Sequence, residues 1–283
     1  RVLWLANVAL PEASRLMGES ASPFGGWLVG SAARLADRED VSLAIAYPGP
    51  KNGTWRGINT TYYQFRRLAS TPKHEGWFPD DFGDLVNWVR PDLVHIFGTE
   101  FGQTLAMVNA CIAHRVPFVI SVQGLVSVIA THYTLGLPPE VQSRYTVRDL
   151  LRHDNIRRQQ MKLAERGRFE ITAIRKARHV IGRTAWDQAC VGRLNPAAVY
   201  HHCNEILRSE FYEGTWNMRN CRKSTLFVAQ AGYPIKGLHL LLEAFVEVAC
   251  DFPDASLVIG GVPVVGSGVR GRVMQSSYGA YIG

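Results

Sequence analysis

A lysine at the start of a predicted helix is the first feature of the sequence that could do chemistry. In the stretch LFVAQAGYPIKGLHLLLEAF, residues 226–245, a short apolar run typical of a buried strand is followed by a turn and then by the spacing of an amphipathic helix. Lys236 and Gly237 stand at the expected start of this helix, where unpaired N–H groups and the helix dipole attract negative charge. The pattern predicts an anion-binding turn. The polar face of the helix is expected to carry His239, Glu243 and Glu247.

Two glycines open another predicted helix. Gly25 and Gly26 follow a strand and a long loop and, with Trp27, begin the helical stretch GGWLVGSAARLAD. Because glycine has no side chain, backbone N–H groups at this point can approach a phosphate or a sugar closely. A plain turn and helix cap remains open as the alternative.

Polar side chains follow two predicted strands. PDLVHIFGTE carries Thr99 and Glu100 just beyond a strand, and PFVISVQGL ends in Gln123 and Gly124. Ligands of open α/β sheets bind at the carboxyl ends of the strands, so Glu100 and Gln123 are the predicted catalytic candidates. A glutamine can donate and accept hydrogen bonds to a hydroxyl-rich ligand, but it cannot act as a base. His95 lies inside its strand, a position more typical of a core histidine.

Two further motifs indicate a function less specifically. YHHCNE places Asn204 and Glu205 at a strand end, and its adjacent histidines point to opposite sides of the strand, which argues against a shared metal. GSGVRG, residues 266–271, fits the spacing of a dinucleotide-binding fingerprint. That fingerprint needs a following helix, a strand and an acidic residue about 20 positions on, whereas no acidic residue follows Gly271. GSGVRG is therefore expected to be a loop.

The elements that must position these residues alternate between strand and helix patterns. Such alternation predicts an α/β fold with a parallel sheet wound on both faces. We expect an N-terminal Rossmann-like domain at 1–204, a linker at 205–222 and a partial second Rossmann-like domain at 223–283. Strands are predicted at 2–6, 41–46, 62–65, 93–98, 117–124, 179–182, 198–202, 226–228 and 255–261, and helices at 25–37, 79–90, 101–114, 138–177, 184–194 and from 238. Residues 7–24 are expected to form a polar loop.

Composition excludes several classes of protein. The chain has 283 residues, of which 47% are hydrophobic, and no run approaches the roughly 18 apolar residues of a membrane span. The N-terminus lacks the features of a secretory signal, so a cytoplasmic protein is expected. The five cysteines are scattered and form no C-x-x-C pair, which predicts reduced thiols and neither a disulfide framework nor a zinc site.

The formal charge of +7 is concentrated in residues 144–178, which hold eleven Lys or Arg and four acidic residues. Two basic series with helical spacing are expected to form a stripe: Arg144, Arg148 and Arg152, and Arg158, Lys162 and Arg166. The stripe is either a solvated helix face or a surface that attracts anionic lipid headgroups or phosphorylated substrates. Nucleic acid is not expected as a partner, because the segment has only two aromatic residues and no known nucleic-acid module.

The order of these stretches resembles the retaining glycosyltransferases of the GT-B fold, glycosyltransferase family 4. The resemblance covers nearly the whole chain, and its most specific part is FVAQAGYPIKGLHLLLEAF followed by FPDASLVIGG. It implies two Rossmann-like domains, with a nucleotide-diphosphate sugar held mainly by the second and a saccharide or lipid-linked acceptor held mainly by the first. It implies no metal or other cofactor. The anion beside Lys236 would be the diphosphate of the donor.

The resemblance also assigns roles to individual residues. Lys236 matches the lysine of the family's Lys-Gly motif, and Gly25 and Gly26 match its first glycine loop. The residues implied for the donor are Gly25, Gly26, Gln230, Lys236 and Gly237, and those implied for the acceptor are Trp27, His95, Thr99, Gly124, Asn204 and Glu205.

The chain departs from the family at three points. Gln230 and Ala231 occupy the stretch where many relatives carry an arginine, and Gln123 falls where many carry a histidine near the acceptor. The paired glutamates that relatives carry later in the second domain have no counterpart after Gly260. The resemblance therefore implies a family member cut inside its second domain, with little or no transferase activity and with exposed apolar surface that favours self-association.

Two other classes of protein remain open. The missing glutamates and Gln123 are also compatible with a catalytically inactive saccharide-binding module, in which Lys236→Ala would leave ligand binding intact. A different Rossmann-type enzyme, such as a nucleotide-sugar epimerase, would bind a nicotinamide cofactor and would need the complete fingerprint that GSGVRG lacks.

Overall fold

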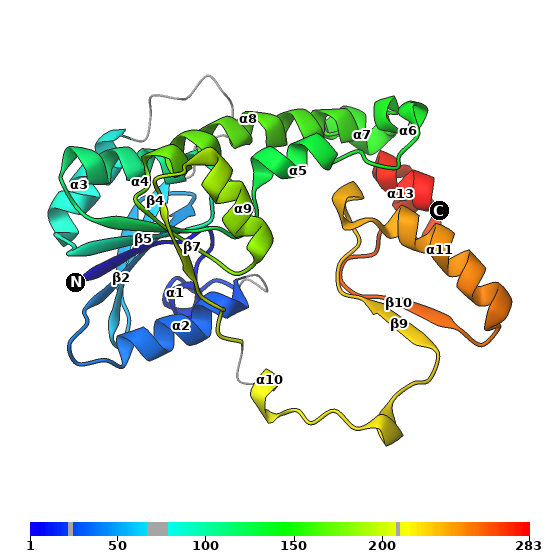
Figure 1. The fold of residues 1–283 in the computed structure, drawn as a ribbon, viewed down its shortest axis with the longest axis horizontal. Helices are drawn as coiled ribbons and strands as arrows, with labels where there is room; N and C mark the ends of the chain where they lie inside the picture. The colour runs from blue at the N-terminus through cyan, green and yellow to red at the C-terminus, as the bar shows by residue number, and fades with distance from the viewer. Residues whose placement is uncertain (22–24, 67–78, 208–209) are drawn as a thin grey trace. The chain divides into compact units, whose positions relative to one another are not determined.

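The computed structural model describes residues 1–21, 25–66, 79–207 and 210–283 (Figure 1). Contacts within the chain divide it into two compact units, the first made of residues 1–127 and 165–214 and the second of residues 128–164 and 215–283. The boundaries expected from the sequence stay a prediction. They assign 128–164 to the first domain, whereas the contacts group these residues with the C-terminal part of the chain.

The first unit is built on one eight-stranded sheet with the order β3-β4-β2-β1-β5-β6-β7-β8. Every pairing is parallel except that of β3 with β4. This sheet confirms the predicted parallel α/β fold. The strands are β1 (Val2–Leu5), β2 (Leu43–Gly49), β3 (Gly53–Arg56), β4 (Thr60–Arg66), β5 (Leu93–Phe97), β6 (Phe118–Ser121), β7 (His179–Gly182) and β8 (Val199–His202).

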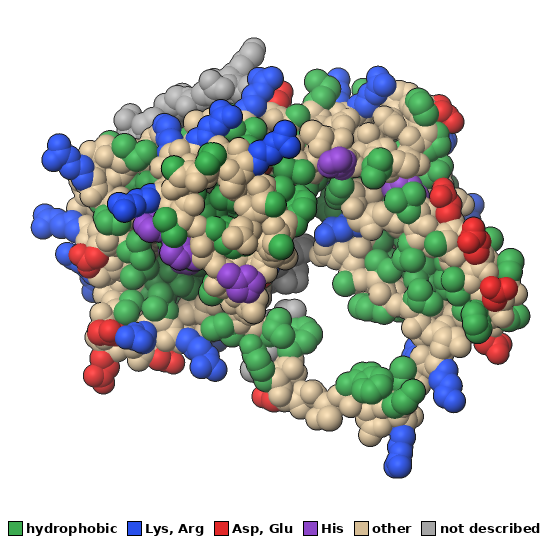
Figure 2. Space-filling model, in the orientation of Figure 1, with side chains coloured by type: hydrophobic (Ala, Val, Ile, Leu, Met, Phe, Trp, Pro, Cys, Tyr) green, Lys and Arg blue, Asp and Glu red, His purple; other side chains and the backbone are tan. Residues whose placement is uncertain are grey.

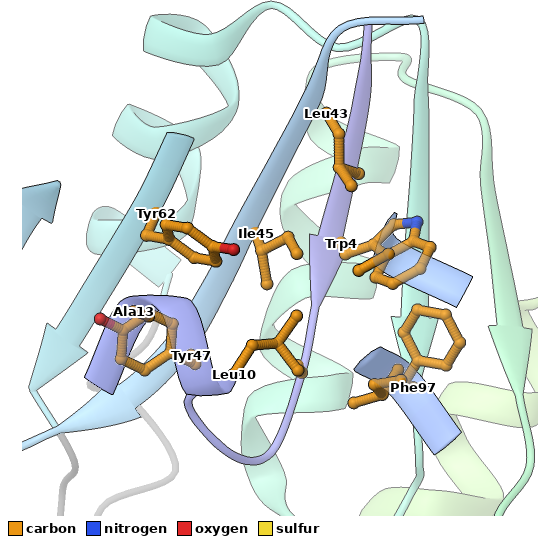
Figure 3. Close-up of a cluster of buried hydrophobic side chains, with 11 residues drawn as sticks. Trp4, Leu10, Ala13, Leu43, Ile45, Tyr47, Tyr62 and Phe97 are labelled. Atoms are coloured by element: carbon orange, nitrogen blue, oxygen red, sulfur yellow. The ribbon is translucent and has the colours of Figure 1, made fainter. Parts of the chain in front are cut away.

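The central strands are buried on both faces, which explains why they appear in the sequence as continuous apolar runs. On β1, Leu3 and Leu5 are buried on one face and Trp4 on the other. The Trp4 face is covered by two helices of the N-terminal region, whose Leu10, Ala13, Leu28 and Ala32 pack on Trp4, Ile45, Tyr47, Tyr62 and Phe97 (Figure 3).

Six helices lie wholly in the first unit, within the residues that the structure describes. Two of them, α3 and α4, pack against each other. The six are α1 (Pro11–Leu16), α2 (Gly26–Ala36), α3 (Pro79–Val89), α4 (Gly102–Ala113), α9 (Ala185–Leu194) and α10 (Glu210–Glu213). Two more, α5 (Val126–His132) and α8 (Ile156–Lys176), run from one unit into the other.

A buried carboxylate from α8 ties the end of β5 to the start of α5. Glu170 accepts hydrogen bonds from the Thr99 hydroxyl at 2.5 Å, from the backbone N–H groups of Val126 and Ser127 at 3.0 and 2.9 Å, and from the Ser127 hydroxyl at 2.5 Å. The carboxylate thus caps the N-terminus of α5. Gly167, one turn earlier on α8, permits this approach, because a Cβ there would lie 2.7 Å from the Ser127 Cα.

The second unit contains a small strand–helix–strand arrangement. Parallel strands β9 (Thr225–Val228) and β10 (Ser256–Ile259) are joined through α11 (Leu238–Asp251), as the periodicity predicted. The 3-10 helix η3 (Pro234–Lys236) precedes α11. Other elements of this unit are α6 (Pro139–Ser143), α7 (Val147–Arg152), the 3-10 helix η2 (Met218–Asn220), α12 (Gly268–Val273) and α13 (Ser277–Ile282).

The core of the second unit lies around the start of α11. It is formed by Tyr133, Leu137, Val141, Ile156, Ala231, Leu238 and Tyr278. His239 belongs to this region, so its predicted position on the polar face was wrong. The ring is buried, with Nδ1 3.1 Å from the Tyr278 hydroxyl and Nε2 3.0 Å from the Leu135 carbonyl oxygen, because α13 and the loop after α5 cover this end of the helix.

Much apolar surface of the second unit is exposed. Figure 2 shows hydrophobic side chains on this unit beside the acidic side chains of α11. They include Phe227 on β9, Ile259 on β10 and Val246 on α11. Both strands of the two-stranded sheet therefore present apolar side chains to solvent.

Two loop predictions need correction. Residues Pro11–Leu16, expected within a polar loop, form α1; Pro11 suits the first helical turn, and buried Ala13 packs in the core. Residues 22–24 of the same predicted loop lie outside the described residues. The predicted GSGVRG loop is partly helical, since α12 begins at Gly268.

The basic stripe is interrupted. Arg144, Arg148 and Arg152 were expected on one helix face, but Arg144 ends α6 with an extended backbone, and Thr146 begins α7 with a capping box. Arg148 is bound to Asp149 at 2.9 Å, and Lys162 to Asp154 at 3.0 Å. The other basic side chains of α8 include the exposed Arg157, Arg158 and Arg168. Within the described ranges, no helix combines the length and the apolar character needed to cross a bilayer.

Replacing the buried carboxylate tests its structural role. Glu170→Gln keeps the shape but turns an N–H₂ group toward donors, so we expect the free energy of unfolding to fall by about 2–4 kcal/mol in urea denaturation. Glu165→Gln, on the same helix but only partly buried, is the matched control and should change stability by less than about 1 kcal/mol. Equal losses in the two variants would contradict the role assigned to Glu170.

Candidate functional site

Two adjoining cavities lie at the carboxyl edge of the first unit's sheet. The first, named here the Glu100 cavity, has a volume of about 170 Å³ and is lined by Asn7, Val8, Gly25, Trp27, Leu28, Phe97, Glu100 and Gln123. The second, the Glu205 cavity, has a volume of about 110 Å³, and its lining includes Trp4, Trp27, His95, Phe97, Arg183 and Glu205. Trp27, Phe97 and Gln123 line both.

The strand order explains why the Glu100 cavity forms where it does. From β1 the chain continues outward through β2 and β4, and it then returns to add β5 on the other side of β1. The loops after β1 and β5 therefore diverge and leave a crevice at this switch point, the position where open α/β sheets bind ligands. Asn7 follows β1 and Glu100 follows β5, so both face this crevice.

Glu100 is held by a short chain of amides. The Asn7 side-chain N–H donates to the Glu100 carboxylate at 3.0 Å, and the Asn7 carbonyl oxygen accepts from Gln103 at 2.8 Å. Gly98 makes room for this arrangement, because its φ is +84° and a Cβ there would lie 2.2 Å from Glu100 Oε2. Burial, chiefly, raises the pKa of Glu100. A carboxyl with a raised pKa at the wall of a cavity is a candidate for proton exchange with a ligand.

The start of α2 faces the same cavity. Gly25 is the N-cap residue with a φ of +77°, and no side chain of the described residues caps the helix. A Cβ on Gly25 would lie 2.6 Å from Val8 Cγ2, so a larger residue would push into the wall. Gly26 is the first residue of the helix, and its neighbours Gly25, Trp27 and Leu28 line the cavity. This helix start can accept an anion or a sugar hydroxyl.

The predicted residues at the β5 and β6 ends separate into two groups. Gln123 lines both cavities, and its backbone carbonyl accepts a hydrogen bond from Arg183 at 3.2 Å. Thr99 is fully buried and bound to Glu170 and to the Gly124 carbonyl, and neither Thr99 nor Gly124 lines the Glu100 cavity or the Glu205 cavity. These two lie behind the site, where they support its backbone.

Aromatic rings form the wall of the Glu205 cavity. The Phe97 ring lies 4.7 Å from Trp4, 5.5 Å from Trp27 and 3.9 Å from His95, centroid to centroid. His95 Nε2 is 2.7 Å from the Ser121 hydroxyl, and burial lowers the His95 pKa to about 4. His95 is therefore an uncharged member of the wall at neutral pH.

An ion pair completes the Glu205 cavity. Arg183, directly after β7, lies 2.7 Å from Glu205 Oε2, and both side chains are partly buried. Asn204 also lines this cavity. The sequence analysis did not select Arg183 or Trp4. Arg183 was detectable, because it is a charged residue immediately after a predicted strand, whereas Trp4 carried only the signal of a buried strand.

The predicted donor residues Gln230, Lys236 and Gly237 belong to the second unit. Gly237 has a φ of +70° and is the N-cap of α11 without a side-chain cap, and Lys236 is the exposed last residue of η3. Gln230 is exposed in the turn after β9, and the neighbouring Ala231 is buried. The local geometry is thus an uncapped helix start with a lysine beside it.

Within the residues that the structure describes, no group of three or more His, Cys, Asp or Glu side chains is arranged to hold a metal ion. All five cysteines are free. Of the two carboxylates in the cavities, Glu100 has an amide partner and Glu205 has an arginine partner.

Several solved structures are similar to this chain at low sequence identity. The UDP-GlcNAc 2-epimerase from Methanocaldococcus jannaschii matches 93% of this chain with 10% identity and a TM-score of 0.47, and this chain spans 66% of its length. LpCGTa in complex with UDP matches 92% of this chain and 70% of its own, with 11% identity and a TM-score of 0.43. Medicago truncatula UGT71G1 complexed with UDP-glucose matches 93% of this chain and 72% of its own, with 9% identity and a TM-score of 0.41.

No protein-family model matches the sequence, and a search of curated proteins finds no match.

The pKa of His95 predicts a pH dependence of stability. An unfolded histidine titrates near 6.5 and folded His95 near 4, so between these values the unfolded state binds more protons and stability falls as the pH falls. In His95→Gln this loss should shrink by up to about 3 kcal/mol across the window, measured by urea denaturation between pH 4 and pH 7. His114→Gln, at an exposed position of the same unit, is the control. Parallel pH profiles of His95→Gln and the unmodified protein would contradict the assignment.

Proposed function

We propose that this chain belongs to a glycosyltransferase of the GT-B type that transfers a sugar from a nucleotide-diphosphate sugar to a saccharide or lipid-linked acceptor. Membership of glycosyltransferase family 4 and retention of configuration are part of this proposal and rest on the sequence resemblance. The single observation that carries it is the cavity at the sheet's switch point, where the uncapped start of α2 and the Glu100 carboxyl line the same space. Such a space suits a sugar carrying an anionic leaving group.

Donor-binding roles are proposed for a helix start of each unit, taken separately. In the first unit, the N–H groups around Gly25 and Gly26 would donate hydrogen bonds to phosphate or sugar oxygens. In the second unit, Lys236 would neutralise the diphosphate as the bond to the sugar breaks, with Gly237 and Gln230 beside it.

Glu100 and Gln123 are the proposed catalytic residues of the first unit. Glu100, whose pKa burial raises, would exchange a proton with a reacting hydroxyl. Gln123 would orient a hydroxyl by donating and accepting hydrogen bonds. The residues proposed to contact the acceptor all line the Glu205 cavity: Trp27, His95, Asn204 and Glu205. Thr99 and Gly124 would act through the backbone that they support.

The basic segment of the chain bears on where the protein acts. We infer a cytoplasmic enzyme with peripheral contact to anionic lipid through residues 144–178, supported by exposed Arg158 and Arg168 on α8.

The alternative function is a catalytically inactive saccharide-binding module of the same fold. It is favoured by Gln123, which cannot act as a base.

The donor assignment is tested by titrating the protein with UDP-, GDP- and ADP-sugars in a calorimeter. At least one should bind, and Lys236→Ala should weaken its affinity about tenfold through loss of a charge-assisted contact. Lys223→Ala removes another exposed lysine of the same unit and should have little effect. If saccharides bind but no nucleotide sugar does, the binding-module alternative replaces the transferase.

A glycine variant tests the Glu100 cavity. Gly25→Ala forces a side chain into a positive-φ position and places its Cβ against Val8, so nucleotide-sugar binding should weaken at least tenfold. Gly18→Ala is a matched control, because Gly18 also has a positive φ but open space around its Cβ position. Comparable affinity in the two variants would show that the cavity beside Gly25 does not hold the donor.

A further inference from the structure

Two unpartnered buried polar atoms belong to side chains that line the Glu205 cavity. The side-chain atoms of this kind in the described part of the chain are Trp4 Nε1, Glu205 Oε1 and Ser277 Oγ. Trp4 and Glu205 both belong to this cavity. Each such atom costs about 1–3 kcal/mol when it is left without a hydrogen bond, so two in one small cavity call for an explanation.

The two atoms have complementary requirements. The Trp4 indole N–H can only donate, and an ionised carboxylate oxygen of Glu205 can only accept. Figure 3 shows the indole nitrogen at the end of the Trp4 ring that lies away from Phe97. A ligand that satisfies both atoms must present an acceptor and a donor, and hydroxyl groups provide both.

The charges around the cavity argue against an anionic ligand. The Arg183 guanidinium is bound to Glu205 Oε2 at 2.7 Å and to the Gln123 carbonyl at 3.2 Å. The arginine is thus neutralised by the same carboxylate whose other oxygen is unpartnered. A phosphate in this cavity would meet that carboxylate without a spare positive charge to offset it.

The apolar part of the cavity suits a ring with C–H faces. Trp4, Trp27, His95 and Phe97 supply four neighbouring rings, with only a few polar groups among them. Pockets of this composition bind ligands through packing on the rings, and the few polar atoms set the orientation.

We propose that the Glu205 cavity binds an uncharged pyranose ring, with one hydroxyl accepting from Trp4 Nε1 and one donating to Glu205 Oε1. This rests on the proposed function, and it makes the acceptor of that reaction a neutral saccharide end and not a phosphate-bearing group. Trp4 and Arg183 become specificity residues: Trp4 contacts the sugar, and Arg183 holds Glu205 in place.

Cys203 provides a readout that does not depend on transfer. This exposed residue lines the Glu205 cavity, while the exposed Cys221 and Cys250 lie outside it. The protein is alkylated with iodoacetamide in the presence of methyl glucoside, methyl galactoside, methyl mannoside or N-acetylglucosamine, and in the presence of the corresponding 6-phosphates. Each cysteine peptide is followed by mass spectrometry, with Cys221 and Cys250 as internal references.

At least one neutral sugar should slow Cys203 alkylation threefold or more, with the two reference rates unchanged and with its 6-phosphate without effect. The inference is overturned if no neutral sugar protects Cys203, or if the 6-phosphates protect it equally well. Protection without nucleotide-sugar binding refutes the transferase and leaves the sugar site standing. Nucleotide-sugar binding without protection of Cys203 supports the transferase and refutes the sugar site.

Two variants separate recognition from folding. Trp4→Phe keeps an aromatic side chain, smaller than the indole, and removes the N–H donor, so it should raise the sugar concentration needed for protection about tenfold. Trp88→Phe, at a highly exposed position of α3, is its control. Glu205→Gln should weaken protection by the neutral sugar and, because Arg183 is then uncompensated, allow the 6-phosphate to protect. A Glu205→Gln protein that still excludes the 6-phosphate contradicts the charge argument.

Discussion

The burial of one carboxylate constrains the whole site of the first unit. A carboxylate removed from water is strongly destabilising unless hydrogen bonds replace its hydration. Glu170 obtains four, from Thr99, Val126 and Ser127, and each of them fixes a piece of backbone. Because Thr99 immediately precedes Glu100, the bond that stabilises Glu170 also determines where the Glu100 side chain leaves the chain.

The hydrogen-bonding partners of Glu100 and Glu205 determine what each carboxylate can do. Glu100 is held by the neutral amide of Asn7, so burial is not offset by a positive charge, and its pKa is raised. Glu205 lies against the Arg183 guanidinium, which balances its charge. The first arrangement favours proton exchange, and in the second the carboxylate is paired with a cation. One sheet edge therefore carries a group suited to reaction and a group suited to recognition.

The parallel sheet and most helices were predictable, because strands buried on both faces and amphipathic helices leave strong periodic signals. The glycine pair at Gly25 and the strand-end position of Glu100 were predictable for the same reason, since they punctuate those signals. Helix α1 was missed because it has only six residues, too few for a period to emerge. His239 was misplaced because its helix is covered at one end by α13, a long-range contact that local periodicity does not encode.

Arg183 and Trp4 mark two different limits of such prediction. Arg183 follows β7 as Glu100 follows β5, so the rule that selected the glutamate applies equally to the arginine. No such positional rule selects Trp4. An indole within an apolar strand is indistinguishable from core until its neighbours are known, and what separates Trp4 from core is that its N–H group is buried without a partner beside a cavity. That property depends on residues far along the chain, so only the folded arrangement reveals it.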